Sequence, residues 1–139
     1  MRTPVLIFGL AALSACSGAD SGGDSGDAAA GGDFRALAEC SARMDAVSNL
    51  YAAIADTTGN SEMTSTAELR AAAARVLKAE AEKVAGDASA EVEKIIGETK
   101  AAIDAEQQKR EFEDFGAWVG QQADGCASIV QEIVKKSAP

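Results

Sequence analysis

Three kinds of hydrophobic and polar patterning follow one another along the chain. A nearly unbroken apolar run, VLIFGLAALSA, occupies positions 5–15, and a stretch built only from Ser, Gly, Asp and Ala follows at 17–33. From Phe34 onward, apolar residues recur at alternating steps of three and four, which is the spacing of one face of a helix. We therefore predict a short apolar leader, a flexible polar tether and an all-helical domain.

The first helix of the domain is predicted from about Phe34 to Ala55, with Asp33 as its N-cap. Its apolar stripe consists of Leu37, Cys40, Met44, Val47, Tyr51 and Ile54. Gly59-Asn60 then lies inside a cluster of turn-forming residues, DTTGNSEMTS. The pattern therefore predicts a break there.

A second helix is predicted at the sequence Ser65-Thr66-Ala67-Glu68, which has the form of a capping box. Its narrow, alanine-rich stripe consists of Leu69, Ala72, Ala73, Val76, Leu77, Ala81 and Val84. Gly86 fits the C-terminal end of this helix, and Asp87 or Ser89 is expected to cap the next one. A single kinked helix running through Gly86 is the alternative.

The last two stripes continue the helical pattern. The third helix carries Val92, Ile95, Ile96, Thr99 and Ile103. The final stripe consists of Phe112, Phe115, Val119, Gln122, Cys126, Ile129 and Ile133. Because Gly116, Gly120 and Gly125 can each bend or end a helix, we place a turn between Gln107 and Gly125.

Charge and residue chemistry exclude several functions. The chain carries 13 Lys and Arg residues against 22 Asp and Glu residues, a formal net charge of −9, so phosphate backbones repel it and we expect no nucleic-acid binding. It contains no histidine, which removes a principal zinc ligand and the commonest acid–base catalyst. We therefore predict a non-enzyme without cofactor or metal.

Recurring carboxylates do not change this prediction. They form three groups, Glu80 with Glu82, Glu91 with Glu93, and Glu111 with Glu113 and Asp114. Helix residues two apart point in nearly opposite directions, so these pairs do not converge on one metal ion. An enzyme would need an acid such as Glu91 or Glu113 in a cleft with a shifted pKa.

The leader has the layout of a secretory signal peptide: one positive side chain at Arg2, the apolar run and small residues at its end. The run is too short for a lasting membrane span, which needs about 20 apolar residues. Leu13-Ser14-Ala15-Cys16 resembles the lipobox of bacterial lipoproteins. The resemblance implies cleavage before Cys16, attachment of a diacylglycerol to its sulfur, and usually acylation of the new amino group. An ordinary signal peptide followed by a chance cysteine is the alternative.

The resemblance also implies a cellular location. Two or three acyl chains give stable anchoring, so the protein would stay on the membrane without spanning it, facing the periplasm. Ser17 after the lipidated cysteine resembles the signal for the outer rather than the inner membrane. The implied partners are the lipid bilayer, the lipoprotein processing and sorting machinery, and an unknown envelope protein. The predicted parts are the signal peptide at 1–15, Cys16 with its tether at 16–33, and the helical domain at 34–137.

If Cys16 carries lipid, one pair of cysteines remains, Cys40 and Cys126, in a compartment where disulfides persist. We predict that they are joined, which stabilises the fold by about 4–5 kcal/mol in the chain-entropy model. Two buried free thiols or an intermolecular bridge are the alternatives. A bridge between the start and the end of the domain fits an antiparallel bundle of four helices, or an equivalent arrangement with an antiparallel closing segment.

The function that fits these features is a membrane-anchored periplasmic lipoprotein whose helical module binds, scaffolds or inhibits another envelope component without catalysis. A small-molecule carrier that uses the bundle interior is the alternative. Trp118, the sole tryptophan, lies just off the final stripe and is the candidate partner contact. The alternative is a structural role, in which Trp118 only covers the edge of the core.

Overall fold

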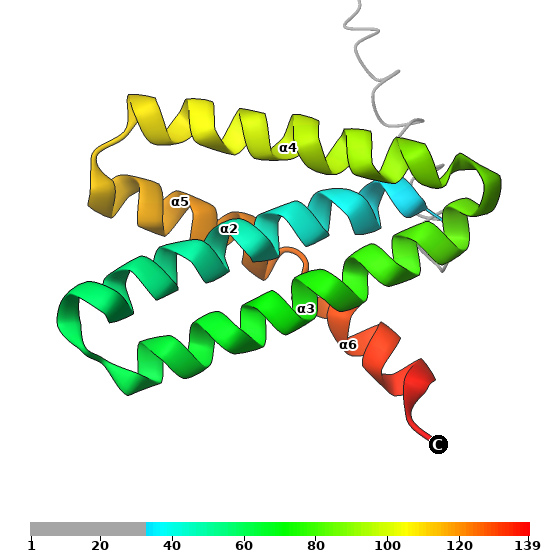
Figure 1. Cartoon of the computed structure of the whole chain (residues 1–139), viewed down its shortest axis with the longest axis horizontal. Helices are drawn as coiled ribbons and strands as arrows, with labels where there is room; N and C mark the ends of the chain where they lie inside the picture. The colour runs from blue at the N-terminus through cyan, green and yellow to red at the C-terminus, as the bar shows by residue number, and fades with distance from the viewer. Residues whose placement is uncertain (1–32) are drawn as a thin grey trace, which may run out of the picture. The chain divides into compact units, whose positions relative to one another are not determined.

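Five α-helices follow one another in residues 33–139, the part of the chain that the computed structural model describes (Figure 1). They are α2 (Phe34–Thr58), α3 (Ser61–Ala85), α4 (Ser89–Lys109), α5 (Phe112–Asp124) and α6 (Ala127–Ser137), with a 3-10 turn, η1 (Gly86–Ala88), between α3 and α4. These residues contain no strand, so the all-α class is confirmed. The predicted signal peptide, the lipidated cysteine and the tether up to position 32 lie outside the described residues.

The predicted count of four bundle helices is wrong. Three long helices, α2 to α4, make up most of the bundle, and two short ones, α5 and α6, replace the expected closing helix. α5 runs back antiparallel to α2. The helix is then interrupted at Gly125-Cys126, before α6 begins (Figure 1).

The position of Cys40 gives a physical reason for this break. The part of α2 that precedes Cys40 is about 9 Å long, whereas α6 is about 16 Å long at 1.5 Å per residue. A straight continuation of α5 would therefore pass the end of α2 and lose its partner. α6 turns instead towards α3, which it contacts (Figure 1).

α2 lies at the centre of the bundle and packs against α3, α4 and α5. The predicted stripe is confirmed for Leu37, Cys40, Met44 and Val47, which are buried, while Tyr51 and Ile54 are half-buried. Small residues outside that stripe are buried as well, namely Ala38, Ser41, Ala42, Ser48 and Ala55. They are covered because α2 has neighbours on more than one side.

Two serines of α2 hold the interface with α3. The Ser41 hydroxyl donates a hydrogen bond to the carbonyl of Ala74, and the Ser48 hydroxyl donates one to the carbonyl of Ala67, both at 2.8 Å. Seven residues forward along α2 thus correspond to seven residues back along α3, as an antiparallel register requires. Small side chains on both helices let each hydroxyl reach the neighbouring backbone.

The ends of α2 and α3 follow local capping chemistry. Asp33 caps α2 as predicted, because its carboxylate accepts a hydrogen bond of 3.0 Å from the backbone N–H of Arg35. The predicted start of α3 at Ser65 is wrong, since α3 begins at Ser61. The side chain of Asn60 supplies the cap and accepts hydrogen bonds from the first turn of α3. The break at Gly59-Asn60 is therefore shorter than predicted.

The core face predicted for α3 is wrong in part. Its buried residues are Ala67, Ala74, Leu77 and Ala81, which form a three-four stripe of their own. Leu69 and Val76 belong to the predicted stripe but lie exposed on the flank of the helix. The two stripes overlap in sequence, and only the position of α2 selects between them.

α3 ends at Gly86 as predicted, and Gly86 has a positive φ of 55°, which favours glycine. Neither Asp87 nor Ser89 caps α4, because η1 leads directly into it from Ala88. The predicted α4 stripe is confirmed for Val92, Ile95, Ile96 and Ile103, which are buried, while Thr99 is half-buried. A turn at Arg110-Glu111 separates α4 from α5, within the predicted range.

Cys40 and Cys126 lie at disulfide distance. Their sulfurs are 2.01 Å apart and their Cα atoms 5.6 Å apart, across a sequence separation of 86 residues. Both side chains are buried in the core. The pair links the first turns of α2 to the junction between α5 and α6, where the chain changes direction.

Candidate functional site

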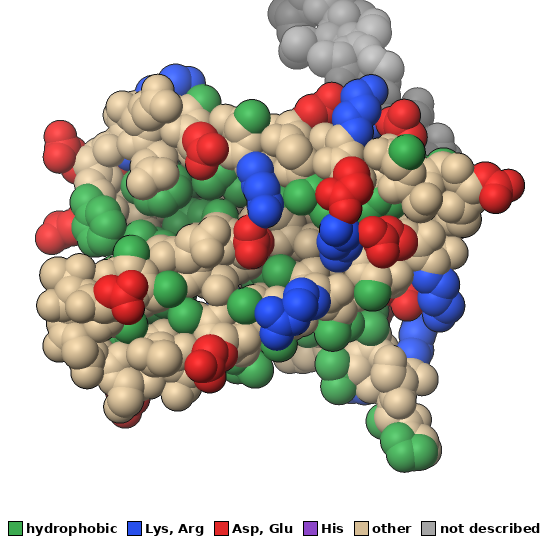
Figure 2. Space-filling model, viewed as in Figure 1, with side chains coloured by type: hydrophobic (Ala, Val, Ile, Leu, Met, Phe, Trp, Pro, Cys, Tyr) green, Lys and Arg blue, Asp and Glu red, His purple; other side chains and the backbone are tan. Residues whose placement is uncertain are grey.

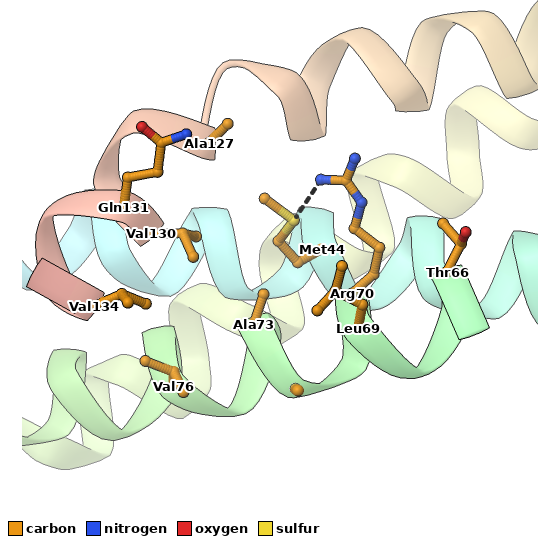
Figure 3. Close-up of a pocket in the computed structure, with 11 residues that line it drawn as sticks. Met44, Thr66, Leu69, Arg70, Ala73, Val76, Ala127, Val130, Gln131 and Val134 are labelled. Atoms are coloured by element: carbon orange, nitrogen blue, oxygen red, sulfur yellow. Dashed lines mark hydrogen bonds between the residues drawn. The ribbon is translucent and has the colours of Figure 1, made fainter. Parts of the chain in front are cut away.

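A groove with a volume of about 440 Å³ lies between α3 and α6 (Figure 3). We call it the α3–α6 groove. Its lining is mainly aliphatic and consists of Met44, Leu69, Ala72, Ala73, Val76, Ala127, Val130 and Val134, with Thr66, Arg70 and Gln131 as the polar members. This volume falls within the range of about 300–1,000 Å³ that is typical of small-molecule sites.

The α3–α6 groove exposes large aliphatic side chains. Leu69 is 70% exposed, Val134 58% and Val76 41%. Space-filling atoms in Figure 2 show apolar side chains gathered where α6 leaves the bundle. Large aliphatic side chains of α3 and α6 therefore lie on the surface around this groove.

The groove exists because α6 is only partly covered. Ile129, Val130 and Ile133 of α6 pack against the core cluster, yet no residue of α6 is buried. The apolar face of α6 is thus wider than the strip that the bundle covers. Val134 remains on the uncovered part and faces the flank of α3 that carries Val76 (Figure 3).

Among residues 33–139, Arg70 is the one charged residue that lines the groove. Its side chain is 29% exposed, and its Nη1 lies 3.5 Å from the sulfur of Met44 (Figure 3). Its Nη2 lies 3.9 Å from a carboxylate oxygen of Asp124, whose own side chain is 74% exposed. A thioether is a weak acceptor and the ion pair is long and exposed to solvent, so both contacts are weak.

The charged surface elsewhere has a structural arrangement. Side chains of both signs alternate over α3 and α4 (Figure 2), and Lys78 pairs with Glu93 while Lys100 pairs with Asp45, joining neighbouring helices. The hydrogen bond that the exposed Lys78 ammonium donates to the Glu93 carboxylate raises the pKa of Lys78 above its ordinary value of 10.5. These ion pairs connect neighbouring helices, and their residues do not line the α3–α6 groove.

The predicted candidate residues do not come together at this groove. Trp118 is half-buried against the core, with its ring centroid 6.1 Å from that of Phe115 and the Arg110 guanidinium 5.2 Å from its own ring centroid. Its predicted partner contact stays a prediction. Of the carboxylates that an enzyme would need, Glu91 and Glu113 are both exposed. Residues 33–139 contain no group of three His, Cys, Asp or Glu side chains placed to hold a metal ion.

Sequence reasoning missed the α3–α6 groove because it assigned every apolar stripe to the core. A signal was nevertheless present in α6, where Ile129, Val130, Ile133 and Val134 form two adjacent stripes rather than one. A helix at the edge of a small bundle covers only part of so wide a face. Leu69 gave a similar signal. It lies one residue before Arg70, which is the position seven residues before the buried Leu77, so Leu69 falls beside the core stripe of α3.

None of the helices between residues 33 and 139 has both the length and the apolar composition that crossing a bilayer requires. Comparison with known proteins adds no further constraint on the site: no protein-family model, curated protein or solved structure matches this chain.

Proposed function

We propose that this chain is a membrane-anchored lipoprotein of the bacterial envelope whose helical domain is a non-catalytic binding, scaffolding or inhibitory module. In this proposal residues 1–15 are a cleaved signal peptide, acylated Cys16 is the anchor, and the tether to position 33 lets the domain move relative to the membrane. The domain faces the periplasm, from the outer rather than the inner membrane. The lipobox-like sequence and the polar linker support this part of the proposal.

The observation that carries the binding role is the α3–α6 groove. Its described residues combine an aliphatic lining, three exposed large side chains and a single cation in one concave surface. Such a combination is typical of sites that bind a partly apolar ligand. The proposal of a non-catalytic role rests on residue chemistry, since the chain has no histidine.

A carrier that uses the bundle interior has less support. The side chains that face the centre of the bundle, Met44, Leu77, Val92 and Val119, are fully buried in a single core cluster. A ligand inside the bundle would have to displace them. The outer groove is accessible without any such rearrangement, which favours a binding module over a carrier with an internal cavity.

The anchoring proposal is tested by mass spectrometry of the protein purified from membranes. We expect a mature N-terminus at Cys16 that carries a diacylglycerol and an additional acyl chain. The Cys16→Ser variant should lose membrane association, and the wild type should sediment with outer-membrane markers in a density gradient. An unmodified sulfur at Cys16, or cleavage at another position, would contradict the proposal. Thr3→Ser, a conservative change outside the lipobox, is the matched control and should leave acylation unchanged.

A further inference from the structure

Among the described residues that line the α3–α6 groove, the one charged side chain, Arg70, lies away from its Val76 and Val134 end. Figure 3 shows Thr66 and Arg70 towards one end, and Val76 and Val134 towards the other. The rest of the lining consists of alanine and aliphatic side chains, together with Met44 and one uncharged polar residue, Gln131. A ligand that fills the groove must therefore place an anionic or polar group near Arg70 and an extended apolar portion along the two helices.

Arg70 can still bind an anion. Its weak contacts with Met44 and Asp124 leave most of the five N–H donors of the guanidinium available, and the group is only partly exposed to water. A planar guanidinium binds a carboxylate through two parallel hydrogen bonds, and partial burial strengthens such a pair.

We infer that the α3–α6 groove binds a long-chain fatty acid, with its carboxylate on Arg70 and its alkyl chain between α3 and α6. This inference names the ligand of the proposed binding module and so rests on that proposed function. An alkyl chain suits the lining, because no aromatic side chain is among its residues in the described part of the chain, whereas protein–protein contacts are enriched in Tyr, Trp and Phe. One charge at one end of an aliphatic groove also matches an amphiphile with a single head group.

The binding test uses palmitate and the full chain with Cys16→Ser, which has no sulfur at position 16 to be acylated. Titration below the critical micelle concentration, followed by calorimetry, should show saturable binding of one palmitate per chain. Arg70→Gln should weaken binding about tenfold, because a hydrogen bond to a charged group is lost. Hexadecanol, which has no charge, should bind the parent chain and the Arg70→Gln variant equally.

Two further variants give opposite results if the inference is correct. Asp124→Asn removes the carboxylate that competes for Arg70 and should strengthen palmitate binding several-fold. Val134→Asp places a charge in the apolar part of the groove and should abolish binding, although Val134 is exposed and the fold should be retained. Arg75→Gln is the matched control, since Arg75 is an exposed arginine of the same helix outside the groove.

Three outcomes would overturn the inference. One is the absence of palmitate binding by a folded chain, and another is binding that Arg70→Gln and Val134→Asp leave unchanged. The third is self-association or capture of a helical peptide that Val134→Asp abolishes while palmitate has no effect, which would assign the groove to a protein partner. Failure of acylation at Cys16 would overturn the anchoring proposal alone, because the palmitate titration is done without the anchor.

Discussion

α2 and α6 carry apolar residues at the same three-four spacing, yet nine residues of α2 are buried and none of α6 is. α2 has three helices around it, whereas α6 lies at the edge of the domain and packs against α3. The comparison shows that spacing predicts which face of a helix is apolar, while the number of neighbours determines how much of that face is covered. The part of the apolar face of α6 that no neighbouring helix covers forms one side of the α3–α6 groove.

The link between Cys40 and Cys126 connects these two regions, and its removal should have the largest effect. Replacing both residues by alanine should lower the free energy of unfolding by about 2–5 kcal/mol, because a long closed loop is released in the unfolded chain. Urea denaturation monitored by circular dichroism measures this loss. Reductant added to the wild type should reproduce it, and Cys16→Ser should not. An unchanged midpoint would contradict the stabilising role of this pair.

The second test compares one residue type in the two helices. Val47→Ala in α2 should lower the free energy of unfolding by about 2 kcal/mol, because it removes buried methyl groups and leaves a cavity. Val134→Ala in α6 should change it by less than about 0.5 kcal/mol, since the side chain is exposed. Chemical denaturation of both variants gives the two values. Equal losses would mean that α6 is as tightly covered as α2.

A smaller effect is expected at the interface between α2 and α3. Ser48→Ala removes the hydroxyl that donates to the carbonyl of Ala67 and should cost about 1 kcal/mol of stability. Ser65→Ala, which removes an exposed hydroxyl bonded within α3, is the control and should be nearly neutral. Thermal unfolding of the two variants checks the difference. If Ser48→Ala is also neutral, packing alone holds this interface.

The smallest effect concerns the ion pair between Lys78 and Glu93 on the surface of the bundle. Because this pair raises the pKa of Lys78, it contributes stability below pH 10.5, and the contribution is lost as the pH rises through the folded-state pKa. Stability measured against pH should therefore fall slightly more at alkaline pH for the wild type than for Lys78→Met. Lys83→Met, at an exposed pair within α3, is the control. Added salt should also reduce the difference.

Much of the bundle could be predicted from residue order because the controlling interactions are local. The stripes of α2 and α4, the Asp33 cap and the end of α3 at Gly86 all depend on residues within a few positions of one another. The start of α3 was misplaced by competition between two local caps, since both Asn60 and Ser65 suit that role. Asn60 caps the helix in the structure and thereby adds a turn to its beginning.

The groove could not be predicted in the same way, because it depends on where another helix ends. α6 turns at Gly125-Cys126 since the first turns of α2 offer too short a surface beyond Cys40. That change of direction places Val130 and Val134 opposite Leu69 and Val76, which are distant in the chain. The spacing of residues along the chain does not predict that these side chains lie opposite one another.

The sequence by itself determined that the domain is all-helical, where α2 and α4 carry their apolar faces and which cysteines were available to pair. Helix formation and capping act over a few residues, so their signals can be read directly from residue order. Only the tertiary structure decided that the closing segment divides into α5 and α6 and that an aliphatic groove remains beside Arg70. Burial depends on the length and position of neighbouring helices, which are properties of the assembled domain.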